Sequence, residues 1–355
     1  MVYILIFLFC SIYLYFVEGR VHNKNFISFF VILFPVFLVY WLPMAFQKGV
    51  GTDYYEYYNY FFNNDHIFYL EKKEFIYYAI VEFTQYLGIP QFQFILISFI
   101  QSLIFFGILF LLSKDGYNLW IFFLLFFLIT GIYNNQMNGI RQFVAVFCLP
   151  VFLIFLHQKK YIKAIFFSFI AIMFHFSSIL PLFFLLMVNC ISKYFSNKII
   201  IIIFIISPFF YLLNISDFVF GLMRDYGIFY STYENSEYNQ TISLSDMMLK
   251  FVGIPFFIIF LFIYWRDQCK DNLFDKFALV WSLTFFMFLL NFNFGMAGRL
   301  YIYFIFFSIF PMYYIFIKSR KIALLIVVYY FSFYFAKVFL FAKNEYLYSF
   351  NGSWL

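Results

Sequence analysis

Long apolar runs recur along the whole sequence and are separated by short polar stretches. A helix rises about 1.5 Å per residue, so about 20 mostly apolar residues cross a hydrocarbon core about 30 Å thick. Windows of this kind, some of them shorter, predict about 12 membrane spans. The predicted spans are residues 2–17, 26–46, 91–112, 119–133, 140–156, 164–177, 179–191, 199–213, 249–265, 277–291, 300–317 and 322–342.

Composition excludes a water-soluble globular protein. Hydrophobic residues make up 65% of the 355 residues and charged residues 11%, whereas soluble domains are about 45–50% apolar and about 25% charged. We therefore expect an all-α, polytopic membrane protein that forms a single domain over residues 1–355. The net charge of +6 is modest and indicates no nucleic-acid-binding surface.

The distribution of lysine and arginine predicts the orientation in the membrane. If the N-terminus is outside, about 14 of the 23 basic residues fall in inward loops and about 9 on the outer side, as the positive-inside rule favours. The two long loops, residues 47–74 and 214–250, then face outward. The short spans 164–177 and 179–191 are either one long tilted helix or a re-entrant pair, and Pro181 favours a break between them.

The polar stretch Asn138-Gly139-Ile140-Arg141-Gln142 lies between two apolar runs. An arginine at the end of a membrane helix costs a few kcal/mol, so its presence requires an anionic partner or a hydrated cavity. In the predicted topology Arg141 is on the outer side. We therefore predict that it is the centre of an outward-facing site that binds a phosphate-bearing lipid.

Two further polar residues interrupt apolar runs on the same predicted side. His175 lies near the outer end of its span and is followed by Ser177; it is either a satisfied interior histidine or a group that hydrogen-bonds a phosphate or a sugar. Arg299 follows small residues and precedes Tyr301 and Tyr303. It is either a snorkelling arginine at the membrane interface or a second ligand-binding cation.

The first long loop contains Gly49-Val50-Gly51-Thr52-Asp53-Tyr54, followed by tyrosines at near-helical spacing. Two explanations of Asp53 are open: it caps the following helix, or it is a carboxylate that takes a proton from a sugar hydroxyl. Residues 71–74 are interpreted as a solvated stretch with no functional role. The pattern of residues 75–88 predicts a helix that lies along the membrane interface.

These residue types suit the transfer of a sugar from a lipid pyrophosphate. Guanidinium groups bind phosphate oxygens bidentately and stay charged at any relevant pH. Fixed arginines can neutralise the charge that develops on a pyrophosphate leaving group. The sequence has no DxD or HExxH cluster, so we expect a metal-independent site without a cofactor.

In order along the chain, four motifs resemble the EpsG-like family of bacterial exopolysaccharide and O-antigen polymerases of the Wzy type. The motifs are Gly51-Thr52-Asp53-Tyr54, Asn138-Gly139-Ile140-Arg141-Gln142, Phe174-His175-Phe176-Ser177, and Arg299 with Tyr301 and Tyr303. The resemblance implies a multi-pass glycosyltransferase of the GT-C type in the bacterial inner membrane. Such enzymes join oligosaccharide repeat units carried on undecaprenyl pyrophosphate at the periplasmic face, and a chain-length regulator is a possible partner.

On this basis we assign roles to eleven residues. The expected catalytic residues are Asp53, Arg141, His175 and Arg299, and the expected substrate-binding residues are Gly51, Tyr54, Asn138, Gln142, Ser177, Tyr301 and Tyr303. Three other functions stay open, namely an O-antigen ligase, a polysaccharide flippase and a membrane acyltransferase.

Overall fold

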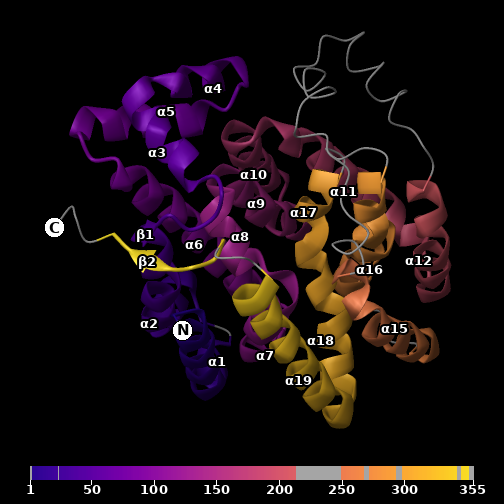
Figure 1. The fold of residues 1–355 in the computed structure, drawn as a ribbon. Coiled ribbons are helices and arrows are strands. Elements are labelled where there is room, and N and C mark those ends of the chain that lie inside the picture. Colours follow the sequence, from indigo (N-terminus) through magenta and orange to yellow (C-terminus); the bar gives the residue numbers. More distant parts are fainter. Residues whose placement is uncertain are drawn as a thin grey trace, which may run out of the picture. The chain divides into compact units, whose positions relative to one another are not determined.

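A computed structural model describes residues 2–22, 24–212, 249–267, 272–292, 298–341 and 345–351. The chain divides into two compact units, the first made of residues 1–182 and 320–355 and the second of residues 183–319 (Figure 1). Each unit is described by itself. The predicted loop at residues 214–250 lies outside the described residues except for its last two.

Unit 1 is built almost entirely from helices. Its elements are α1 (Val2–Val21), α2 (Phe26–Ala45), β1 (Gln47–Lys48), α3 (Tyr54–Asn63), a 3₁₀ turn (Asp65–Ile67), α4 (Phe68–Glu71), α5 (Phe75–Leu87), α6 (Gln91–Lys114), α7 (Leu119–Leu125), a π-helical turn (Phe126–Thr130), α8 (Ile132–Asn138), α9 (Ile140–His157), α10 (Tyr161–Phe174), a 3₁₀ turn (Phe176–Ser178), α19 (Arg320–Ala336), a second π-helical turn (Lys337–Phe341) and β2 (Ser349–Phe350). The helix α11 (Ile179–Ile191) begins in this unit and continues into the other.

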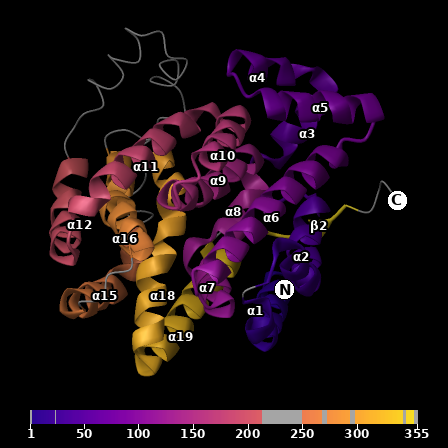
Figure 2. The same cartoon turned by 180° about the vertical axis from the view of Figure 1, so that it is seen from behind.

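The core of unit 1 is formed by α6 and α9, which pack against each other. Nearly every residue of α9 is buried, so this helix is enclosed by protein rather than by lipid. Aromatic rings fill the space beside it: Phe105 lies 4.4 Å from Phe126 and 4.9 Å from Tyr40, measured between ring centroids. The short helices α3, α4 and α5 gather at one end of the unit in both views (Figures 1 and 2).

A broken helix inside unit 1 carries a row of amide side chains. The chain bends by 60° between residues 119–130 and α8, at Gly131, whose φ of +62° is unfavourable for other residues. In α8 the amide oxygens of Asn134 and Asn135 accept hydrogen bonds from Tyr334 at 2.8 Å and Tyr346 at 2.6 Å. These two bonds join α8 to α19 and to the C-terminal segment.

A two-stranded antiparallel pair joins the C-terminal segment to the start of the first long loop. Gln47 pairs with Phe350 and Lys48 with Ser349. Beyond the pair, the Asn351 side chain donates a 2.8 Å hydrogen bond to Gln91. Residues 345–351 therefore act as a strap across the segment that leads into α3.

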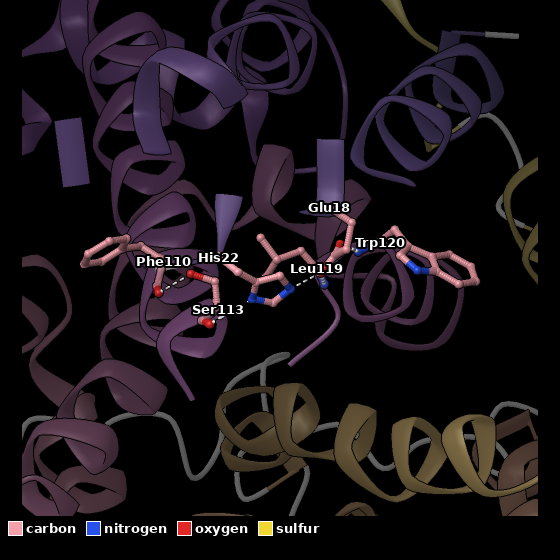
Figure 3. Close-up of polar contacts among 6 residues, drawn as sticks. All are labelled: Glu18, His22, Phe110, Ser113, Leu119 and Trp120. Carbon is pink, nitrogen blue, oxygen red and sulfur yellow. Dashed lines mark hydrogen bonds and ion pairs between the residues drawn. The ribbon is translucent and has the colours of Figure 1, made fainter. Parts of the chain in front are cut away.

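The N-terminal end of α7 is held by a carboxylate from another helix (Figure 3). Glu18 of α1 accepts the backbone N–H groups of Leu119 at 2.9 Å and Trp120 at 3.1 Å. His22 lies 3.0 Å from the same carboxylate and 3.2 Å from the Ser113 carbonyl oxygen at the end of α6. A negative charge at a helix N-terminus satisfies free donors and is favoured by the helix dipole, so this contact fastens α1, α6 and α7 together.

Unit 2 is likewise helical. Its elements are the remainder of α11, a 3₁₀ turn (Ser192–Tyr194), α12 (Asn197–Tyr211), a 3₁₀ turn (Leu249–Gly253), α15 (Ile254–Arg266), α16 (Asn272–Thr284), a 3₁₀ segment (Phe285–Phe292), α17 (Gly298–Phe304), a 3₁₀ turn (Ile305–Ser308) and α18 (Ile309–Lys318). The buried Trp281 stacks on Phe204 at 4.4 Å and lies 4.9 Å from Phe257, so aromatic packing joins α12, α15 and α16.

Apolar helices of spanning length confirm the all-α, polytopic prediction. Among the described residues, eight helices are long and apolar enough to cross a membrane, or nine if the bent pair at Gly131 is one span. The figure of about 12 spans stays a prediction. The break expected between residues 164 and 191 exists, but it lies at His175 and residues 176–178, before Pro181, which falls inside α11.

Candidate functional site

Arg141 lies in the first turn of α9, where its side chain meets a carboxylate that the sequence analysis had set aside. Its guanidinium Nη1 donates to Oε2 of Glu74, the residue immediately before α5. The Glu74 side chain is fully buried, and that of Arg141 is 13% exposed. The interpretation of residues 71–74 as a solvated stretch is therefore wrong for Glu74. A buried charge needs a partner, and here each ion supplies it for the other.

His175 reaches the same carboxylate from a third element. The helix α10 ends at Phe174, and His175 adopts an extended backbone before the 3₁₀ turn begins. Its ring Nδ1 lies 2.7 Å from Glu74 Oε1, which also accepts the Phe176 backbone N–H at 3.3 Å. A single carboxylate thus joins Arg141 and His175, and the catalytic roles expected of the two residues stay predictions.

Three tyrosines surround the Arg141 guanidinium. Its Cζ atom lies 4.2 Å from the ring centroid of Tyr69, 5.1 Å from that of Tyr77 and 5.6 Å from that of Tyr57. Faces of aromatic rings attract cations, and the attraction grows when water is excluded. Burial raises the pKa of Tyr69 to about 12 although Arg141 opposes the shift. The tyrosines are therefore neutral at physiological pH and hold the cation in place.

The ionisation of Glu74 depends on its two partners. Burial alone would raise its pKa, but the attraction of Arg141 and His175 outweighs burial and lowers the pKa of Glu74 to about 2. A carboxyl group whose pKa is lower in the folded than in the unfolded protein stabilises the fold above its unfolded pKa. That contribution is lost as the pH falls through the folded value.

We predict an acid-dependent loss of stability that arises from Glu74. With a pKa of about 2 instead of the ordinary 4.5, ionised Glu74 contributes about 3 kcal/mol, which disappears between about pH 5 and pH 2. The stability difference between the unmodified protein and Glu74→Gln, measured by thermal unfolding in detergent, should shrink over this interval. A difference that stays constant down to pH 2 would contradict the assignment.

The backbone of Asp53 is bound by Asn138, the asparagine three residues before Arg141. The Asn138 side-chain oxygen accepts the Asp53 backbone N–H at 2.8 Å. Asp53 occupies the position before α3, yet its carboxylate makes no capping bond to that helix and accepts the Thr52 hydroxyl at 3.0 Å. Burial raises the pKa of Tyr57, Arg141 lowers it and Asp53 raises it further, so both charges act on this one hydroxyl.

Gly51 permits the close approach of this loop to α8. Its φ is +83°, its N–H donates to the Glu345 carbonyl oxygen at 2.9 Å, and a Cβ atom there would lie 2.6 Å from Asn138. Two independent constraints therefore require glycine, namely the left-handed backbone and the contact with Asn138.

Replacing Gly51 with alanine should displace the loop that carries Asp53. Gly116 is a matched control, because its φ of +80° is similar but a Cβ atom there would meet no atom of the described residues within 4 Å. Backbone strain of about 1 kcal/mol is common to both substitutions. We expect Gly51→Ala to lose most activity and Gly116→Ala to keep most of it, measured as surface polysaccharide at equal membrane level. Equal loss in both variants would show that the contact with Asn138 is unimportant.

The other predicted site residues are divided between the two units. In unit 1, Tyr54 is buried, stacks on Phe94 at 4.7 Å and hydrogen-bonds Gln91, while Gln142 and Ser177 are partly exposed. In unit 2, Arg299 is exposed at the start of α17, and Tyr301 and Tyr303 are buried. The roles assigned to these residues stay predictions.

Glu74 and the three tyrosines are the components that sequence reasoning missed. Glu74 stands in the charged run Glu71-Lys72-Lys73-Glu74, which is typical of a solvated turn, and the three tyrosines are hidden among 29 others. A usable signal was the spacing from Glu74 to Tyr77, which places a carboxylate at the start of an amphipathic helix whose buried face carries a tyrosine.

One family model covers residues 29–351, a range that includes Gly51, Glu74, Arg141, His175 and Arg299. It describes the EpsG family. The chain belongs to the EpsG family. Neither a curated protein nor a solved structure matches the chain. Membership identifies this EpsG-family chain as a membrane protein of polysaccharide biosynthesis, as the resemblance implied.

Proposed function

We propose that this EpsG-family protein is a glycosyltransferase that polymerises oligosaccharide repeat units carried on undecaprenyl pyrophosphate. The reaction takes place at the periplasmic face of the inner membrane. The observation that carries the proposal is the partly exposed pair Arg141 and His175, held on one buried carboxylate beside the loop of Asp53. An arginine and a histidine next to a carboxylate suit a reaction with an anionic leaving group and a hydroxyl nucleophile.

In this mechanism Arg141 and His175 bind the diphosphate of the donor. The bond between the anomeric carbon and the diphosphate oxygen breaks, and that oxygen keeps the electron pair. The developing charge is neutralised by a guanidinium that remains charged throughout. The roles expected of Arg299, Tyr301 and Tyr303 stay predictions.

Asp53 is the base for the acceptor. The acceptor hydroxyl oxygen forms the new bond to the anomeric carbon, and its proton passes to the Asp53 carboxylate. The growing chain leaves its polyprenyl carrier and is transferred to the non-reducing end of a new lipid-linked unit, while Gln142, Tyr54 and Ser177 position the sugars.

Deletion of the gene that encodes this protein, followed by a surface-polysaccharide gel, tests the proposed function. A polymerase predicts loss of long ladders with single-unit products retained. A ligase or a flippase predicts loss of the single-unit product as well, because neither attachment nor export would then occur. An acyltransferase leaves ladder length unchanged. Complementation with the unmodified chain restores the ladders if the proposal is correct.

A further inference from the structure

We propose that Glu74 is the positioning residue of this site: it holds Arg141 and His175 in the arrangement that acts on the donor diphosphate. This inference rests on the proposed function and assigns a role to a residue outside it. Glu74 acts through its two partners and does not itself touch substrate.

Glu74, Arg141 and His175 differ in how much of each side chain is exposed. The Glu74 side chain is fully buried, whereas Arg141 is 13% exposed and His175 is 18% exposed. The carboxylate therefore lies behind Arg141 and His175, which retain the accessible surface. An incoming anion meets Arg141 and His175 first, and Glu74 is in the position of a supporting group.

Glu74 belongs to an element distinct from those of its partners. Arg141 starts α9 and His175 ends α10, while Glu74 is fixed by the turn between α4 and α5. In that turn the Glu74 N–H donates to the Tyr69 carbonyl oxygen at 2.9 Å, and Lys73 has a φ of +60°. A left-handed lysine is uncommon and persists where surrounding contacts enforce it. One carboxylate thus fixes the ends of two helices relative to a third element.

Tyr69 contacts both Glu74 and Arg141. Its carbonyl oxygen accepts the Glu74 N–H, and its ring covers the Arg141 guanidinium at 4.2 Å. The turn therefore positions both the Glu74 carboxylate, which accepts from Arg141, and the Tyr69 ring, which covers Arg141. Arg141 Nε is buried and has no hydrogen-bond partner among the described residues, so the orientation of the guanidinium depends on the Glu74 contact and the three tyrosines.

The charge of Glu74 leads to an unusual expectation. Neutralising the carboxylate leaves the positive charge of Arg141 uncompensated, which favours anion binding. It also releases Arg141 and His175 from their fixed geometry, and a displacement of about 1 Å can cost roughly 100-fold in rate. A positioning role therefore predicts lower turnover without weaker binding of a diphosphate. A purely structural role predicts that folding, binding and turnover are lost together.

Glu74→Gln is the test, and Glu71→Gln is its matched control, since Glu71 is exposed and only three residues away. Each purified full-length variant is assayed for inorganic pyrophosphate binding by calorimetry and for its melting temperature. Each is also assayed for polymer made in the deletion host at equal membrane level. We expect Glu74→Gln to lose roughly 10- to 100-fold of polymer while binding pyrophosphate at least as tightly as the unmodified protein. Glu71→Gln should match the unmodified protein throughout.

Glu74→Asp resolves the case in which Glu74→Gln does not fold. The shorter side chain keeps the charge but cannot reach both partners, so polymer should fall at least about tenfold with the fold retained. Full polymer from a folded Glu74→Gln or Glu74→Asp overturns the inference, and so does weaker pyrophosphate binding in folded Glu74→Gln. Failure of the proposed function would appear separately, as unchanged ladders after deletion of the unmodified gene.

Discussion

Arg141→Lys will eliminate long polysaccharide chains although the substitution keeps the positive charge. Lysine presents one compact ammonium, whereas the guanidinium donates to Glu74 and has three tyrosine rings around it. An ammonium cannot make the planar, bidentate contact to phosphate oxygens that arginine makes. We expect a loss of about 100-fold or more in polymer, which is the range for removing one group that stabilises a developing oxyanion.

Lysine is a sharper test than alanine at this position. Arg141→Ala would leave the fully buried Glu74 unpaired, and removing one partner of a buried pair costs about 3–5 kcal/mol. Lost activity could then reflect lost folding. Arg20→Lys is the control, because Arg20 is exposed at the end of α1. Normal ladders from a well-expressed Arg141→Lys protein would refute the proposal that Arg141 binds the donor.

Asp53→Asn should reduce turnover by about 10²- to 10⁴-fold, the usual contribution of a general base. The substitution is nearly isosteric and leaves intact the backbone bond to Asn138, so the loop should keep its place. Turnover is measured with lipid-linked repeat units in membranes from the deletion host. Asp65→Asn is the control, since Asp65 is exposed in the next turn of the same region.

Unchanged turnover in Asp53→Asn would remove Asp53 as the base. Glu345 would then be the next candidate for the base. Its carbonyl oxygen accepts the Gly51 N–H at 2.9 Å. Burial raises the pKa of Glu345 against the influence of Lys337, and the nearby charge of Asp53 adds to the increase. The C-terminal strap thus brings a second carboxylate to the loop that carries Asp53.

The location of polar residues within apolar runs was enough to find Arg141 and His175. A charge in a membrane helix is costly wherever its partner lies, so the sequence reveals that a partner exists without revealing which residue it is. The same reasoning failed for Glu74, because a glutamate among charged neighbours is inexpensive in water. Its burial depends on helices α9 and α10, which lie far along the chain.

The need for glycine at position 51 illustrates the same limit. The sequence indicated a tight turn there, since two glycines stand close together. It could not indicate the contact with Asn138, which is 87 positions away and is created when the loop packs on α8. The question whether Asp53 caps α3 was likewise settled only by the geometry, because a capping sequence permits the bond without requiring it.

Membrane-protein class, helical architecture and the candidate arginine and histidine were determined by the sequence alone, since the length of apolar runs and the cost of isolated charges are local properties. The carboxylate that joins Arg141 to His175, the tyrosines around the guanidinium and the docking of Asp53 through Asn138 were decided only by the tertiary structure. These contacts join side chains from separate helices, and their energies depend on burial that arises when those helices pack.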